Sequence, residues 1–280
     1  MDSYRRRKLL DVLARGACVA ATLLAILPLA SVLTYVAAKG LGGLSWSLFT
    51  ELPRPVGEAG GGFGNALLGS LLLVGLACAV GIPVGVLAGV YLAEFGENRF
   101  GKAVRFCADV MSGVPSIAVG IFVYTLIVLS MRRFSALAGG IALGILMLPT
   151  ITRTTEELLK LVPDSLREAG LALGVPRWRV ILSVVLRTGA PGIATGVMLA
   201  VARAAGETAP LLFTAFNNRF WSTNLNQPIG SLPVQIFTYA VSPYDEWHAQ
   251  AWAAALVLVA MVLLLNIGAR LLTASREGGR

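Results

Sequence analysis

Long apolar runs separated by short polar segments dominate the pattern of this 280-residue chain. Most runs reach about 20 residues, the length that an α-helix needs to cross a bilayer. The pattern therefore predicts an all-α integral membrane protein with six transmembrane helices. We expect the spans at about 17–38, 66–92, 107–130, 136–151, 183–213 and 251–272.

Two of these runs are irregular. The fourth is short for a full span, and we expect its helix to continue to about Leu161. The fifth contains Gly189, Pro191 and Gly192, which predict an interruption there. The first run follows four consecutive basic residues and shares the polarity of a secretory signal peptide. Because it is long enough to span, we expect an uncleaved first helix.

Composition agrees with a membrane protein. The chain is 56% hydrophobic and 14% charged, with a mean hydropathy of +0.75, which excludes an ordinary soluble domain. The net charge of +8 can indicate nucleic acid, but most basic residues fall in the loops of one predicted side. We therefore expect a multi-pass protein of the cell membrane, in contact with lipid and not with nucleic acid, with both termini cytoplasmic. The predicted division is a cytoplasmic segment at 1–16, a transmembrane domain at 17–272 and a cytoplasmic tail at 273–280.

The loops carry their own short elements. The external loop after the first span, at about 40–64, predicts a short interfacial helix around Trp46 and Phe49. A later external segment contains 231–239, which is compatible with a short helix or an extended clamp on the membrane surface. The cytoplasmic turn at about 94–105 is expected to be short.

One stretch in that turn resembles a nucleotide-binding loop. Residues 96–103 almost match G-x-x-x-x-G-K-[ST], but Ala103 replaces the hydroxyl residue that binds magnesium. No strand-to-helix context surrounds it. We therefore expect no cofactor on this chain, and we expect any ATP to be hydrolysed by another subunit.

The third run contains Ser112, Pro115 and Ser116. Proline removes a backbone hydrogen bond from a helix, so a kink is expected at this point. Such kinks often lie where the wall of a transporter bends or opens. A kink that serves packing alone explains the residues equally well.

The polar segment at about 156–182 is charged and amphipathic. Ser165 and Glu168 have the spacing of a capping box, which predicts a helix that starts at Ser165. Gly174 is placed to end this helix in a left-handed conformation. The segment is therefore expected to form a short helix outside the bilayer.

Charges inside the fifth run are unusual. Arg203 and Glu207 stand four residues apart, so they can share a helix face and form a hydrogen-bonded ion pair. A guanidinium can bind an anion bidentately, and the glutamate would hold it when no anion is present. The pair can thus act as a switched gate. The other interpretation is a permanent structural pair that faces a partner subunit.

Two sets of residues resemble a known family. Glu168, Ala169 and Gly174, with the apolar stretch that ends at Leu186, resemble the EAA loop of ABC-transporter permeases, although Arg187 stands where that pattern usually has proline. The string from Arg203 to Leu211, together with 112–117 and 231–234, resembles the inner-membrane permeases of phosphate import, the PstA type.

The resemblance implies a type I ABC importer fold and a division of labour among residues. It implies that Arg167, Glu168, Ala169 and Gly174 belong to the coupling helix that docks on an ATPase. From the spacing of the two charges in an apolar run, rather than from the resemblance, we expect Arg203 and Glu207, with Thr208 next to them, in the substrate pathway. The implied partners are a homologous second permease, a cytoplasmic ABC ATPase dimer and an extracytoplasmic phosphate-binding protein.

Other functions remain open at this point. A permease of the same architecture for sulfate or molybdate would share these motifs. An ion-coupled secondary transporter would usually carry more acidic groups in its spans and would not need the coupling loop. An intramembrane hydrolase is disfavoured, because His248 is the one histidine and it belongs to no catalytic motif.

Overall fold

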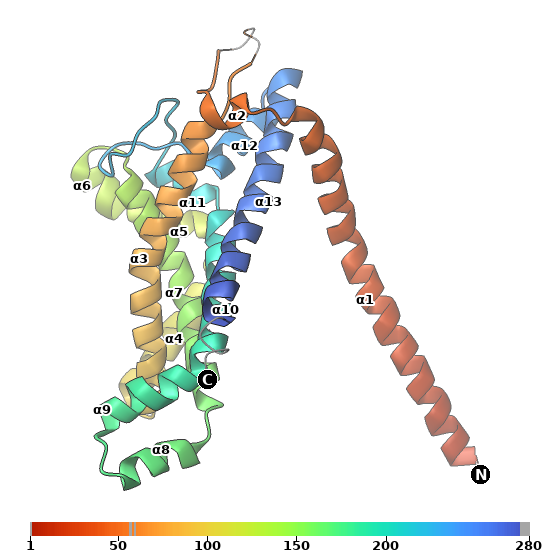
Figure 1. Cartoon of the computed structure of the whole chain (residues 1–280), viewed down its shortest axis with the longest axis vertical. Coiled ribbons are helices and arrows are strands. Elements are labelled where there is room, and N and C mark those ends of the chain that lie inside the picture. The colour runs from red at the N-terminus through yellow and green to blue at the C-terminus, as the bar shows by residue number, and fades with distance from the viewer. Residues whose placement is uncertain (1, 56–57, 59, 275–280) are drawn as a thin grey trace.

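The computed structural model describes residues 2–55, 58 and 60–274. Within them every regular element is a helix, and no strand occurs. The predicted all-α class is therefore confirmed, whereas most of the predicted tail at 273–280 lies outside the described residues. Figure 1 shows a bundle of long helices, a short helical layer at one end and two short helices, α8 and α9, at the other.

Five helices in the described residues are long and apolar enough to cross a membrane, and a bent pair supplies a sixth candidate. The continuous spans are α1 (Asp2–Gly43), α3 (Gly64–Phe95), α7 (Ala136–Lys160), α13 (Asp245–Ala274) and the run Arg177–Ala205. That last run consists of α9 (Arg177–Val180), the π-helix η2 (Ile181–Val185) and α10 (Leu186–Ala205). As predicted, the helix of the fourth apolar run extends well past residue 151.

The core lies between α3 and α7, which share the most extensive helix pair contact. Leu73, Leu143 and Met147 are almost fully buried there. Glycines bring the two backbones close: a side chain at Gly89 would have its Cβ only 2.5 Å from the Cβ of Thr155. Small residues at such contacts are a common means of packing helices in membranes, where close approach replaces the hydrophobic effect.

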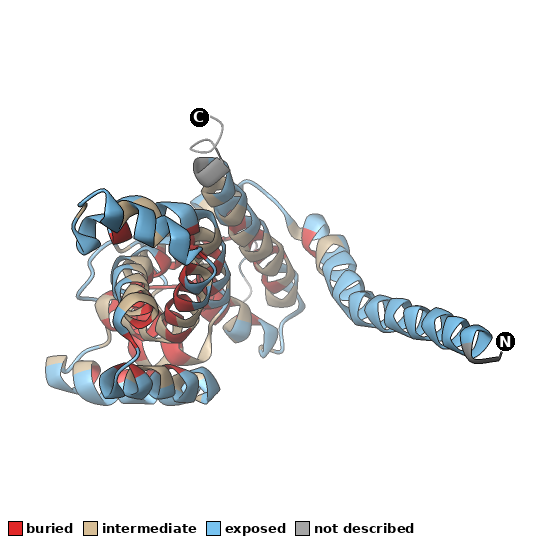
Figure 2. Cartoon of the chain, turned by 90° about the horizontal axis from the view of Figure 1, so that it is seen from below, coloured by how far each residue is buried: buried red, intermediate tan, exposed pale blue. Residues whose placement is uncertain are grey.

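Helix α1 stands apart from this bundle. It is exposed along nearly its whole length and diverges from the other helices (Figures 1 and 2). Its C-terminal end alone packs on α13, with the rings of Tyr35 and Trp252 5.1 Å apart. Residues 2–16 continue the span as one helix, so the predicted N-terminal segment does not form a separate element.

The third span is broken rather than kinked. Helices α4 (Arg99–Gly113) and α5 (Ser116–Val123) meet at an angle of 107°, and α5 continues through η1 (Tyr124–Val128) to α6 (Leu129–Met131). Pro115 lies in the break with extended backbone. The expected turn at 94–105 is wrong in extent, because α4 already begins at Arg99, capped by the side chain of Asn98.

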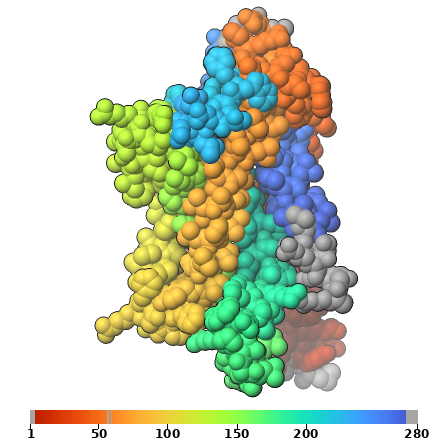
Figure 3. Space-filling model, turned by 60° about the vertical axis from the view of Figure 1, so that its left-hand side comes forward, coloured from red at the N-terminus to blue at the C-terminus, as the bar shows by residue number. Residues whose placement is uncertain are grey.

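The break leaves a recess on one face of the molecule. Figure 3 shows α4 and the α5–α6 segment projecting from the body with a hollow between them. A pocket of about 340 Å³ lies there, lined by apolar side chains that include Met111, Phe122 and Ile145.

The fifth span is interrupted, but not at the predicted place. Gly189, Pro191 and Gly192 all lie within α10, which runs without a break to Ala205. Membrane helices tolerate such residues where neighbouring groups re-satisfy the backbone. The interruption falls instead at Gly206–Thr208, after which the short helix α11 (Ala209–Thr214) begins.

Both short helices considered for the loop segments are present. Helix α2 (Ser47–Thr50) lies beside Trp46, as expected from the loop sequence. The segment 231–239 is helical, since α12 spans Leu232–Ala240, and the extended alternative is wrong. Ser70 Oγ accepts a hydrogen bond from the backbone of Leu232 at 2.7 Å, which fixes the start of α12 on α3.

Candidate functional site

Helix α8 (Asp164–Ala172) projects from one end of the molecule (Figures 1 and 3). Glu168 and Ala169 are exposed on it, and Leu171 and Leu173 add exposed apolar surface. Gly174 follows with φ of +75°, the left-handed conformation that the sequence predicts. An amphipathic helix presented in this way has free surface on which a partner can bind.

The predicted capping box is wrong. The helix starts at Asp164 after Pro163, whose backbone is extended, and no side chain caps its first turn. Ser165 therefore lies inside the first turn rather than before it. The reason is that Pro163 sets a non-helical backbone one residue earlier than the serine pattern suggests.

Arg167 turns inward from α8 instead of lying on its exposed face. Its Nε and Nη2 atoms lie 3.0 and 2.9 Å from Oε1 of Glu94, at the end of α3. The same guanidinium donates to the carbonyl oxygens of Leu159 at 2.8 Å and Val162 at 2.6 Å, at the end of α7. Asp164 accepts a further bond at 3.1 Å. Arg167 thus anchors α8 to two spans.

Arg177 reinforces this anchor from the other side of the loop. Its Nη2 donates to the backbone oxygen of Glu94 at 2.6 Å, and its guanidinium lies 4.6 Å from the ring centroid of Phe95. This cation–π contact adds a favourable interaction energy to that of the hydrogen bond. Both ends of the polar loop are therefore tied to the last turn of α3.

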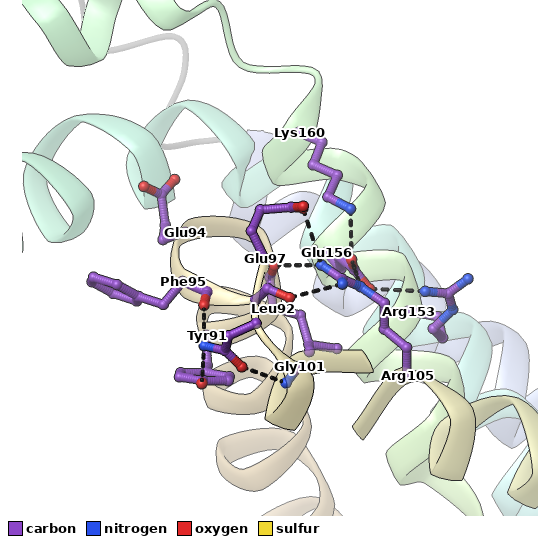
Figure 4. Close-up of polar contacts among 12 residues, drawn as sticks. Tyr91, Leu92, Glu94, Phe95, Glu97, Gly101, Arg105, Arg153, Glu156 and Lys160 are labelled. Carbon is purple, nitrogen blue, oxygen red and sulfur yellow. Dashed lines mark hydrogen bonds and ion pairs between the residues drawn. The ribbon is translucent and has the colours of Figure 1, made fainter. Parts of the chain in front are cut away.

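A second ionic cluster lies on another side of that turn (Figure 4). Glu156 of α7 is 1% exposed and binds three cations: Arg105 at 2.6 Å, Lys160 at 2.7 Å and Arg153 at 2.9 Å. Arg105 also donates to the carbonyl oxygens of Gly96 at 2.9 Å and Leu92 at 3.0 Å. Asp109 of α4 pairs with Arg153 at 3.1 Å. The cluster joins α3, α4 and α7.

Sequence reasoning missed Glu94, Arg105 and Glu156. A signal was available for Glu156, since Arg153 and Lys160 lie three and four residues away on the same helix face. Glu94 ends an apolar run and carries no comparable local pattern, because its partners are 73 and 83 residues away.

Arg203 and Glu207 are close but not tightly bound. Arg203 lies in the last turn of α10, while Glu207 lies in the break, so the two do not share one continuous helix face. Arg203 Nε and Glu207 Oε1 are 3.6 Å apart, which is beyond hydrogen-bond distance. The arginine side chain is 56% exposed, and that of the glutamate 17%. The expected hydrogen bond is thus absent, and an ion pair remains.

The two broken spans meet each other. Helix α5 packs on α11, and Gly120 approaches so closely that a Cβ there would lie 2.6 Å from Cα of Pro210. Thr208 immediately precedes α11. On the other side of the first break, Ser112 donates to the carbonyl oxygen of Ala108 at 3.0 Å and is exposed together with Pro115. The two helices that follow the breaks, α5 and α11, are therefore packed against each other.

Comparison with known proteins identifies the family. The family described as "Binding-protein-dependent transport system inner membrane component" matches residues 81–277. A phosphate transport system permease protein PstA of Yersinia pestis is 48% identical over 277 residues, which cover 99% of this chain and 93% of that protein. The chain belongs to the PstA permease family.

Distant members of the PstA family keep the resemblance. A probable PstA protein of Methanocaldococcus jannaschii is 40% identical over 252 residues, or 90% of this chain and 89% of that protein. The transmembrane fold is shared more widely: an inward-facing structure of the MetNI methionine ABC transporter aligns with a TM-score of 0.60 and 18% identity, over 75% of this chain and 92% of that one. The predicted type I importer fold is confirmed, and the chain is a permease component of an ABC transporter.

Proposed function

We propose that this chain is a membrane-spanning subunit of an ATP-driven importer of inorganic phosphate. The observation that carries the proposal is the similarity, over nearly the whole length, to permeases named for phosphate transport. The chain would act with a homologous second permease, a cytoplasmic ABC ATPase dimer and an extracytoplasmic phosphate-binding protein. ATP would be bound and hydrolysed by the ATPase alone, so this chain would need no cofactor.

Arg203 is the residue best suited to contact the anion in the pathway. Its side chain is more than half exposed, and within the described part of the chain its ionic partner is Glu207, 3.6 Å away. A bidentate bond to phosphate matches the fork of arginine better than the point charge of lysine. We propose that Glu207 holds the guanidinium between transport cycles and releases it to the anion, and that Thr208 lines the same break.

The broken third span supports a pathway in the same region. The bend at Pro115, between Ser112 and Ser116, separates α4 from α5, and α5 leads to α11 beside Thr208. Irregular backbone at membrane depth is stable only where protein or a water-filled cavity surrounds it. We propose that the two breaks together line part of the translocation route.

Helix α8 is the proposed coupling helix. Its exposed face carries Glu168, Ala169 and Leu171, while Gly174 sets the direction in which the chain leaves it. In this function Arg167 would hold the helix in place rather than touch the ATPase, because its side chain is only 18% exposed. The end of the molecule that carries α8 would then face the cytoplasm. The start of α1 lies toward that end in Figure 1, and we propose that both termini are cytoplasmic.

The second permease is supported by α1. An apolar helix exposed along nearly its whole length leaves a large surface that this chain does not cover. Lipid would cover such a helix in part, and a sister subunit is the partner that the family offers.

Uptake of radiolabelled phosphate tests the function directly. The assay uses cells that lack their own phosphate permease and receive this chain with its companion subunits, with excess sulfate as competitor. We expect uptake that requires this chain and is insensitive to sulfate. Uptake of sulfate or molybdate by an assembled complex, with none of phosphate, would instead establish the other oxyanion permease.

A further inference from the structure

Two arginines bind the ends of the central helix pair in a reciprocal way. Arg167, in the helix that follows α7, bonds carbonyl oxygens at the end of α7 and the carboxylate of Glu94 on α3. Arg105, in the helix that follows α3, bonds carbonyl oxygens at the end of α3 and the carboxylate of Glu156 on α7. Each arginine thus connects both members of the pair.

Helix termini explain the carbonyl half of this arrangement. The last carbonyl groups of an α-helix have no partner within the helix and carry partial negative charge. A guanidinium has donors on three nitrogens in one plane, so it can bond two such carbonyls and a carboxylate at once. Lysine has no such fork, and it would satisfy fewer of these groups.

The carboxylates in both contacts are almost fully buried. The side chains of Glu94 and Glu156 are 4% and 1% exposed, and those of Arg167 and Arg105 are 18% and 19% exposed. Charge-assisted bonds in such surroundings are strong and short compared with surface pairs. Helices α8 and α4 are therefore each fixed to the same two spans.

Helix α4 links the Arg105 contact to the broken spans. From Arg105 it continues to the 107° bend at Pro115, and beyond the bend α5 packs on α11, next to the break that follows Arg203. A displacement of α8 would reach the ends of α3 and α7 through Arg167. It would pass from them to α4 through Arg105 and Glu156.

We propose that Glu94, Arg105 and Glu156 are positioning residues that transmit movement of α8 to the broken spans. The inference rests on the proposed function of α8 as the coupling helix. It assigns to buried residues outside α8 a part in coupling, while the exposed face of α8 keeps the contact with the ATPase. Loss of either arginine contact should then leave the ATPase bound but disconnect its hydrolysis from transport.

Reconstituted complexes in proteoliposomes test this separation. The complex contains this chain, its sister permease, the ATPase and the phosphate-binding protein, and the measured quantity is phosphate transported per ATP hydrolysed. For Glu94→Gln and for Arg105→Lys we expect wild-type copurification of the ATPase and a fall of this ratio by about fivefold or more, within the usual range of energetic coupling between sites. In the double variant the fall should be close to that of the more severe single variant, because both contacts act in series.

A matched control isolates the buried contacts. Glu157→Gln changes the exposed neighbour of Glu156 on α7 and removes the same kind of charge without touching either arginine contact. This variant should keep the wild-type ratio. If Glu94→Gln does not assemble, Arg167→Lys is measured instead, since it keeps a cation beside the buried carboxylate.

The outcomes distinguish the inference from the proposed function. A wild-type ratio in Glu94→Gln and Arg105→Lys, or loss of the ATPase from every variant, overturns the inference and leaves the importer standing. A wild-type complex that does not transport phosphate overturns the proposed substrate. In that case the inference is tested by the rate of ATP hydrolysis, measured with and without the binding protein. If the binding protein no longer stimulates hydrolysis in Glu94→Gln, the inference is supported; if the stimulation is unchanged, the inference is overturned.

Discussion

Two of the arginine–glutamate pairs in this protein, Arg167–Glu94 and Arg203–Glu207, differ sharply in burial and bonding. At the α8 end, Arg167 bonds a buried glutamate and two backbone carbonyls, so its donors are largely satisfied. At the α10–α11 break, Arg203 lies 3.6 Å from Glu207 and remains more than half exposed. The chemistry of the two pairs is the same, but the number of bonds on each guanidinium differs.

The difference indicates what each arginine can do. A guanidinium that already bonds a carboxylate and two carbonyls gains little from a further anion, and removing a partner leaves a buried charge. A guanidinium held by one ion pair at 3.6 Å, beyond hydrogen-bond distance, has fewer bonds to lose when it turns to an anion. The first arrangement suits an anchor, and the second suits a binding group.

The largest effect is expected at the buried cluster. Glu156→Gln would leave Arg105, Arg153 and Lys160 without their shared carboxylate, and we expect it to destabilise the protein by about 3–5 kcal/mol. Thermal unfolding of the purified complex, followed as a lower Tm, measures the loss. Its exposed neighbour provides the control, since Glu157→Gln should change stability by less than about 0.5 kcal/mol. Equal Tm values for the two variants would remove the distinction between anchor and surface charge.

The next effect separates the two arginines by function. Arg203→Lys keeps the charge but loses the fork, and we expect phosphate uptake to fall about 30-fold, the equivalent of a loss of ~2 kcal/mol. Stability and ATPase copurification should stay at wild-type levels, because the Arg203 pair is loose. Arg133→Lys, an exposed arginine elsewhere in the chain, is the control. Full uptake by an assembled Arg203→Lys complex would contradict the gate.

A smaller effect is expected at the exit of α8. Gly174 has φ of +75°, and apart from its two chain neighbours no described residue has an atom within 4 Å of the position that a Cβ would take there. Gly174→Val is therefore strained by backbone conformation alone, at roughly 1–2 kcal/mol. We expect the backbone that follows α8 to change direction, so that ATP hydrolysis continues with less transport. The amount of phosphate transported per ATP hydrolysed in proteoliposomes measures this effect. Gly174→Asn, which tolerates the left-handed region, should behave more nearly like wild type, and equal ratios for valine and asparagine would argue against the strain.

The smallest effect tests what holds the start of α8. Ser165→Ala should change Tm by the equivalent of less than about 0.5 kcal/mol, because the serine caps nothing in the structure. A true N-cap would cost about 1 kcal/mol on the same change. Differential scanning calorimetry of the complex decides between them, and a loss near the larger figure would restore the capping box.

Local features were predictable from the sequence. The lengths of the apolar runs and the left-handed Gly174 depend on residues close together in the chain, and the structure contains both. For 231–239 the sequence left a helix and an extended segment open, and the structure has the helix. The string from Arg203 to Leu211, together with 112–117, 231–234 and the EAA-like loop, was enough to indicate a resemblance to the phosphate permeases. Hydrophobic length and backbone preference are properties of short segments, so they can be read without knowing the fold.

Tertiary structure decided the breaks and the anchors. It moved the interruption of the fifth span from Pro191 to Gly206, turned the kink at Pro115 into a 107° bend and directed Arg167 inward. Glu94 meets Arg167 across 73 residues and Glu156 meets Arg105 across 51. The sequence determined which segments are helical and which side chains carry charge. Only packing of distant helices decided which charges are buried together, because burial and hydrogen-bond saturation are properties of the assembled bundle.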